Sequence, residues 1–84
     1  MQLPKLKVLI EAGAVREAEA MADGDGWAVW IVHATRGGER REPLERQRGG
    51  ARVFATLGAV ARCLAAVGLG GFAVNLPGKG EELP

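Results

Sequence analysis

The chain has 84 residues, a net charge of +1 and 48% apolar residues, which fits one domain with a thin core, because a chain of this size buries only about 60–65% of its unfolded surface. A single cysteine excludes an intrachain disulfide and gives no reason to expect an oxidising compartment. No apolar run approaches the roughly 20 residues of a membrane helix, and the start lacks a signal-peptide layout, so we expect a cytoplasmic protein without a membrane partner.

The first predicted element is a helix over residues 4–12. Pro4 suits the first helical position because its φ is fixed and its missing N–H would have no partner there. Gly13 suits the left-handed position that ends a helix. The apolar residues of this segment recur at helical spacing and predict a buried face: Leu3, Leu6, Leu9 and Ile10.

Residues 16–22 alternate alanine with larger side chains and predict a strand. Alanine and glutamate are weak strand formers, so an extended helix is the alternative for this segment. Residues 23–26, Asp-Gly-Asp-Gly, then predict a tight turn, since aspartate bonds to its own backbone and glycine accepts a positive φ. The segment resembles the start of a calcium loop, but its twelfth position is Ala34 instead of glutamate, so we expect no metal site.

Residues 27–35 predict a central strand with two apolar faces. Such a strand is covered on both sides, or its second face is an interface. Trp27 and Trp30 are three residues apart, so their side chains should point to opposite faces of the strand. We expect one in the core and the other under the first helix or at a subunit interface. The candidate protein-interface residues are Trp27, Trp30 and Val32.

Residues 36–52 are the basic part of the chain, with six arginines and three glutamates. After a turn at 36–39, Pro43 confines residues 40–48 to an edge strand or an irregular loop. Arginines on or beside a β-ribbon can contact DNA phosphates, and a ribbon can enter the major groove. The interleaved glutamates favour the alternative of a solvated edge that resists sheet-to-sheet pairing. The candidate DNA-binding residues are Arg36, Arg40, Arg41, Arg46, Arg48 and Arg52.

Residues 51–76 predict a strand end at 51–54, a helix from 57 to 67 and a short strand at 72–76, followed by a flexible tail at 77–84. Thr56 is a suitable N-cap, and Gly68 is suitable as the left-handed residue that ends the helix. In a Schellman ending, Leu69 then packs on Leu64. The apolar stripe of the predicted helix consists of Leu57, Val60, Ala61, Leu64 and Val67.

The inventory of reactive side chains disfavours an enzyme, because the chain has no serine, no tyrosine and one histidine. We interpret Cys63, in the middle of the second helix, as a small buried side chain instead of a nucleophile. We interpret His33 as a packed or rim histidine instead of a ligand or base. We therefore predict no catalytic residues, no metal, no cofactor and no small-molecule substrate.

The segments MQLPKLKVLIEAGAVREA and ARVFATLGAVARCLAAVGLGGFAVNL together resemble the small partition-associated proteins of the ParC type, carried by plasmids and integrative elements. The resemblance implies a context of partition or mobile-element genes and transfers no activity or site residue. The motif RVFAT at 52–56 is also similar to the β-ribbon-plus-helix modules of plant AP2 domains and phage-type integrase N-termini. That likeness implies DNA contact from the sheet.

We therefore predict one α+β domain over residues 1–76, with a small, mostly antiparallel sheet and two helices in the order α-β-β-(β)-β-α-β. The first hypothesis for its function is a nonenzymatic accessory protein of plasmid or mobile-element maintenance that contacts duplex DNA through the arginines. The second is a protein-interaction or homodimerisation module that uses the apolar strand and has no nucleic-acid role. Its partner would be a second copy or another partition-type protein.

Overall fold

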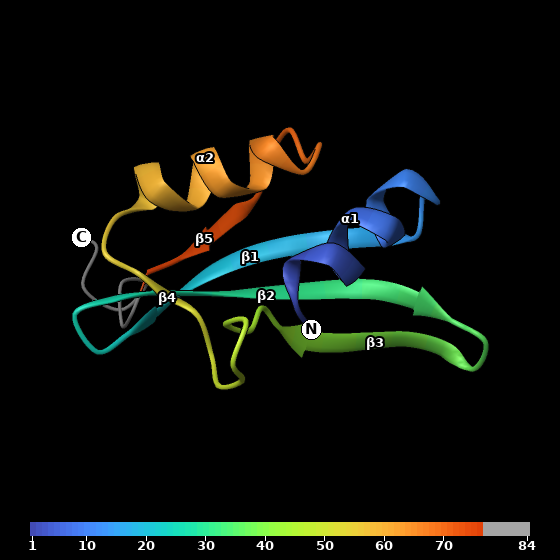
Figure 1. The fold of residues 1–84 in the computed structure, drawn as a ribbon, viewed down its shortest axis with the longest axis horizontal. Helices are drawn as coiled ribbons and strands as arrows, with labels where there is room; N and C mark the ends of the chain where they lie inside the picture. The colour runs from blue at the N-terminus through green and yellow to red at the C-terminus, as the bar shows by residue number, and fades with distance from the viewer. Residues whose placement is uncertain (77–84) are drawn as a thin grey trace, which may run out of the picture.

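Figure 1 shows the computed structural model of the chain, which describes residues 1–76. These residues form a five-stranded sheet and two helices, so the predicted α+β class is confirmed. The tail predicted at 77–84 lies outside the described residues. The elements are α1 (Leu3–Glu11), β1 (Val15–Asp23), β2 (Gly26–Thr35), β3 (Gly38–Pro43), β4 (Val53–Phe54), α2 (Leu57–Ala66) and β5 (Ala73–Asn75).

The sheet has the strand order β3-β2-β1-β5, and the short β4 pairs with β2. β1, β2 and β3 form an antiparallel meander, because tight turns connect them, and this agrees with the predicted mostly antiparallel sheet. β5 instead runs parallel to β1. After β4, the chain passes over the sheet as α2 and then enters the sheet again as β5. A long connection of this kind lets β5 run parallel to its neighbour β1.

Both helices lie on one face of the sheet, which we call the covered face (Figure 1). Residues 15–23 form a strand and not the alternative helix. The weak strand propensity of alanine is overridden here because the small side chains of Ala18 and Ala20 let the helices approach the sheet. The core joins residues of both helices to residues of β1 and β2: Leu6, Val60, Leu64, Ala18, Ala20, Val29 and Ile31.

The two helices end in the same way. The N–H of Leu69 donates to the carbonyl of Leu64 (2.9 Å), and the N–H of Gly68 donates to that of Ala65 (3.0 Å). These bonds form a Schellman motif, and Gly68 has the left-handed φ of 99° that the motif requires. The predicted ending is confirmed, and α1 repeats it at Gly13, with a φ of 70°.

Some predicted details of the elements were wrong. Pro4 is the second helical residue instead of the first, because α1 begins at Leu3. The strand predicted at 51–54 contains only Val53 and Phe54. Cys63 is half-buried against the core and not fully buried.

Gly26 is buried at the start of β2, next to the residues of β2 that pair with β4. A Cβ atom at this position would lie 2.5 Å from the carbonyl oxygen of Phe54 and 2.6 Å from Cγ1 of Val53. The backbones of β2 and β4 therefore approach so closely that this position accommodates no side chain.

Candidate nucleic-acid and protein interfaces

The adjacent arginines of β3 lie on opposite faces of the sheet, because side chains alternate along a strand. Arg40 faces the covered side, where its Nε lies 3.7 Å from a carboxylate oxygen of Glu42. Arg41 faces the other side, stacks on Trp30 with 4.3 Å between the guanidinium carbon and the ring centroid, and contacts Glu19 at 3.3 Å. The segment that was predicted to contact DNA is therefore divided between two surfaces.

The loop between β3 and β4, residues 44–52, contains three further arginines, and we call it the arginine loop. Nε of Arg46 donates to the carbonyl of Gly49 at 3.3 Å, and the guanidinium of Arg52 stacks on Phe54 at 4.9 Å. Arg48 is exposed. Within residues 1–76, none of these three arginines forms an ion pair with a carboxylate. The remaining candidate, Arg36, is exposed at the turn between β2 and β3.

The glutamates among the arginines have other partners. The N-terminal amine of Met1 is buried, donates to the carbonyl of Pro43 at 2.6 Å, and lies 3.8 Å from Glu42 and 3.6 Å from Glu45. Glu39 lies on the side of the sheet away from the helices, where its Oε2 is 3.9 Å from Nε of Arg16. Sequence reasoning missed this contact because it considered side chains only.

His33 and Glu42 form a buried polar contact beside this amine. His33 is 4% exposed, and its Nε2 lies 2.6 Å from Oε2 of Glu42. The hydrogen bond from His33 lowers the pKa of Glu42, and the positive charge of Lys5 at 3.4 Å lowers it further, against the opposing effect of burial. The prediction of a packed histidine is confirmed.

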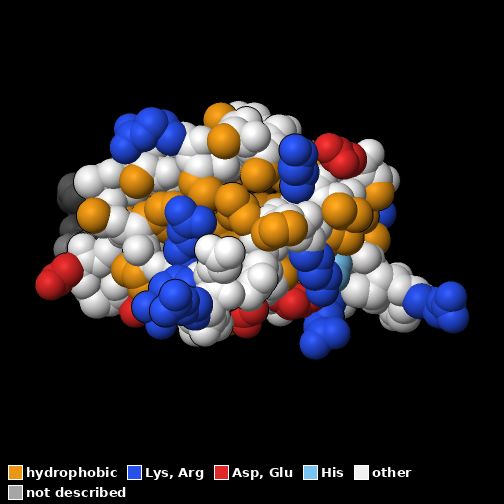
Figure 2. Space-filling view, in the orientation of Figure 1, with side chains coloured by type: hydrophobic (Ala, Val, Ile, Leu, Met, Phe, Trp, Pro, Cys, Tyr) orange, Lys and Arg blue, Asp and Glu red, His pale blue; other side chains and the backbone are white. Residues whose placement is uncertain are grey.

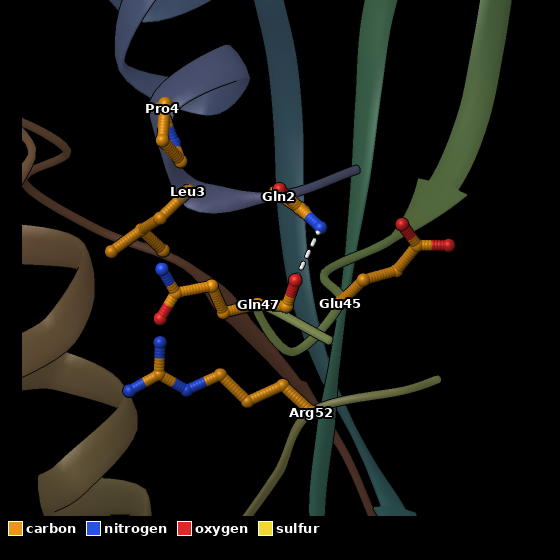
Figure 3. Close-up of a pocket in the computed structure, with 6 residues that line it drawn as sticks. All are labelled: Gln2, Leu3, Pro4, Glu45, Gln47 and Arg52. Atoms are coloured by element: carbon orange, nitrogen blue, oxygen red, sulfur yellow. Dashed lines mark hydrogen bonds between the residues drawn. The ribbon is translucent and has the colours of Figure 1, made fainter. Parts of the chain in front are cut away.

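A pocket of about 320 Å³ lies between the start of α1 and the arginine loop (Figure 3). The side-chain amide of Gln2 donates to the backbone carbonyl of Gln47 at 2.9 Å and joins the two segments. Arg52 extends along one wall, near the side chain of Gln47 (Figure 3). The pocket therefore offers a guanidinium and amides beside a short apolar wall. Its lining residues are Gln2, Leu3, Pro4, Glu45, Gln47 and Arg52.

Basic side chains are spread over the face of the molecule seen in Figure 2, with carboxylates among them along its lower edge. The helix α1 adds Lys5 and Lys7 to the covered side, both exposed. Sequence reasoning did not include these lysines because they lie 31 and 29 residues before Arg36, the start of the arginine-rich segment.

The sheet face opposite the helices, which we call the open face, is partly apolar. Trp30 and Val32 lie on it, half-buried, whereas Trp27 lies on the covered face and packs against the core. The three candidate interface residues are therefore not on one surface, and the opposite orientation of the two tryptophans is confirmed. The cross-strand register assigns these residues to the open face: Glu17, Glu19, Met21, Ala28, Trp30, Val32, Glu39, Arg41, Pro43, Val53, Ala73 and Asn75.

Comparison of the chain with protein families, with curated proteins and with solved structures gives no match. Within residues 1–76, no group of three His, Cys, Asp or Glu side chains is arranged as metal ligands would be. In that part of the chain, no helix is long and apolar enough to cross a membrane. The two candidate sites are therefore the arginine loop and the open face.

Proposed function

We propose that the chain is a nonenzymatic accessory protein of plasmid or mobile-element maintenance that contacts the phosphates of duplex DNA through the arginine loop. The observation that carries the proposal is the grouping of Arg46, Arg48 and Arg52 on one short loop without a carboxylate partner in residues 1–76. Guanidinium groups with free donors are suited to phosphate oxygens. The maintenance context comes from the sequence resemblance alone.

The charges near the loop support this proposal. Glu42 and Glu45 contact the N-terminal amine, so neither is left to repel a phosphate alone. Lys7 adds positive charge on the same side of the sheet, where Lys5 and Arg40 share Glu42 as an ion-pair partner. A polyanion approaching this side would meet a net positive potential.

The open face is less suited to DNA, contrary to what the likeness to AP2 domains and integrase N-termini implies. It presents Glu17, Glu19 and Glu39 with Arg41, and Arg41 already contacts Glu19. Carboxylates at these positions would repel the phosphate backbone. We therefore expect contacts from the loop to phosphates, with little dependence on base sequence.

The test is binding of the full chain to a short labelled duplex, measured by fluorescence anisotropy from about 50 to about 200 mM salt. The Arg46→Glu/Arg48→Glu variant should weaken binding at least tenfold. It should also lower the log–log salt slope by about 0.9 for each phosphate that the variant no longer binds. Arg46 and Arg48 are themselves exposed, so circular dichroism should show an intact fold.

The matched control is Arg16→Glu/Arg62→Glu, which changes the net charge equally at two exposed positions outside the loop. This control should weaken binding much less. An equal decrease in affinity for both variants would mean that only net charge matters, and absence of wild-type binding at tens of micromolar protein would overturn the proposal.

A further inference from the structure

We propose that the open face is the interface of a homodimer, in which two copies pack sheet to sheet about a two-fold axis parallel to β2. The proposal is independent of DNA binding and rests on the apolar centre of this face and on the arrangement of its charges.

The centre of the open face is apolar although no helix of the described chain covers it. Trp30 and Val32 lie in the middle strand, Met21 lies beside them on β1, and Val53 on β4 is 49% exposed. Large apolar side chains at the centre of a surface patch are typical of protein interfaces, in which tryptophan is enriched.

The charges of this face lie on the two strands that flank β2. In one cross-strand row, Val32 has Glu17 on its β1 side and Arg41 on its β3 side. Glu17 is exposed and forms no ion pair within residues 1–76. The row therefore has a negative end at Glu17, an apolar middle and a positive end at Arg41, whose guanidinium also contacts Glu19 of the same chain at 3.3 Å.

Such a row complements its own copy in one orientation. A two-fold axis parallel to β2, in the plane between the sheets, puts β1 of one copy over β3 of the other and keeps each row at the same level. Arg41 then meets Glu17 of the second copy, and Glu17 meets Arg41 of the second copy. Val32 and Trp30 face their own counterparts near the axis. Two sheets that pack face to face usually cross at about 30°, and the long side chains of Arg41 and Glu17 can still reach each other at this angle.

An axis perpendicular to the strands would give the opposite result. It would place β1 over β1 and β3 over β3, so that glutamates face glutamates and Arg41 faces Arg41. Like charges brought together are unfavourable, which favours the first orientation and a second copy with parallel strand direction.

The size of the face predicts a weak dimer. Four strands about 4.8 Å apart and about seven residues of about 3.3 Å each cover about 440 Å². Two such faces bury about 900 Å² in total, which is at the small end of specific interfaces. We therefore expect a dissociation constant in the micromolar range or above.

A charge-swap experiment on the full chain tests both the interface and its orientation. Analytical ultracentrifugation from micromolar to millimolar protein should show a monomer–dimer equilibrium for the wild type. Arg41→Glu and Glu17→Arg should each weaken self-association at least tenfold, because each substitution introduces two like-charge contacts. An equimolar mixture of the two variants should form a heterodimer, since both charge contacts are then attractive again.

The control variants are Glu11→Arg and Arg62→Glu, which make equivalent charge changes on the two helices. Self-association should be unchanged for each control variant alone and for an equimolar mixture of the two. Arg41 also stacks on Trp30, so thermal unfolding must show that Arg41→Glu folds. If it does not fold, Val32→Lys replaces it and should likewise abolish the dimer. A wild type that stays monomeric at millimolar concentration overturns the proposal, as does a mixture of the two variants, both shown to be folded, that does not associate.

Discussion

At the scale of single residues, Glu42 is the position where a sheet carboxylate contacts His33 and two amino groups. Its carboxylate lies 2.6 Å from His33, 3.4 Å from Lys5 and 3.8 Å from the N-terminal amine. Glu42→Gln keeps the shape but removes the charge, and should lower the free energy of unfolding by about 1.5–3 kcal/mol at neutral pH. Chemical denaturation measures this change.

The pH dependence follows from the lowered pKa of Glu42. A carboxyl group with a lowered folded pKa contributes stability above its unfolded pKa of about 4.3, and this stability is lost as the pH falls through the folded pKa. The difference in the free energy of unfolding between wild type and Glu42→Gln should therefore be largest at neutral pH and should decrease in acid. Glu39→Gln, at an exposed carboxylate, is the control and should show a small difference throughout. A Glu42→Gln difference that does not change with pH would contradict this explanation.

At the scale of elements, the end of α2 depends on the backbone conformation of Gly68. A Cβ atom there would lie 3.5 Å from Cγ2 of Ile10, an ordinary contact, so the cost of a side chain comes from the left-handed φ. Gly68→Ala should cost about 1 kcal/mol and lower the melting temperature by about 4–8 °C. Gly70→Ala is the matched control, because Gly70 has neither a positive φ nor a neighbour within 4 Å. Equal melting temperatures for the two variants would show that the glycine is not required by the cap.

Local patterns in the sequence predicted most of these elements because each depends on neighbouring residues. The cap at Thr56 is an example, with its Oγ1 accepting from the N–H of Ala59 at 3.0 Å. The parallel direction of β5 was not predicted, since it depends on the path of the chain across the sheet. For the candidate sites, the alternation of side chains along a strand separated Trp27 from Trp30. The contact that Glu42 and Glu45 share was not predicted, because the amine of Met1 is more than 40 residues away in the chain.

At the scale of the whole molecule, the arginine loop and the open face give different roles to the two sides of the sheet. In a dimer joined through the open faces, the helices and lysines of one copy would lie on the opposite side of the dimer from those of the other copy. We expect such a dimer to hold two separate duplexes. An immobilised duplex should therefore retain a second, labelled duplex when the wild-type protein is added.

The Glu17→Arg variant distinguishes this bridging from simple binding. It adds positive charge and should bind a single duplex at least as well as the wild type, but it should retain much less of the second duplex because it dimerises poorly. Mixing it with Arg41→Glu should restore retention. Retention by Glu17→Arg alone at the wild-type level would show that bridging does not need the open face.

The close approach of β2 and β4 has an evolutionary consequence. Gly24 and Gly26 belong to one repetitive Asp-Gly-Asp-Gly segment, yet only Gly24 has the positive φ that a turn requires. Gly26 is required because the backbone of Phe54 occupies the space of a side chain. In diverging relatives, we expect the turn to change in length and composition while a glycine persists at the first residue of β2, together with a short strand that pairs with β2. This pairing of a glycine with a distant strand is a signature by which relatives of the chain can be recognised after the similarity of their sequences has faded.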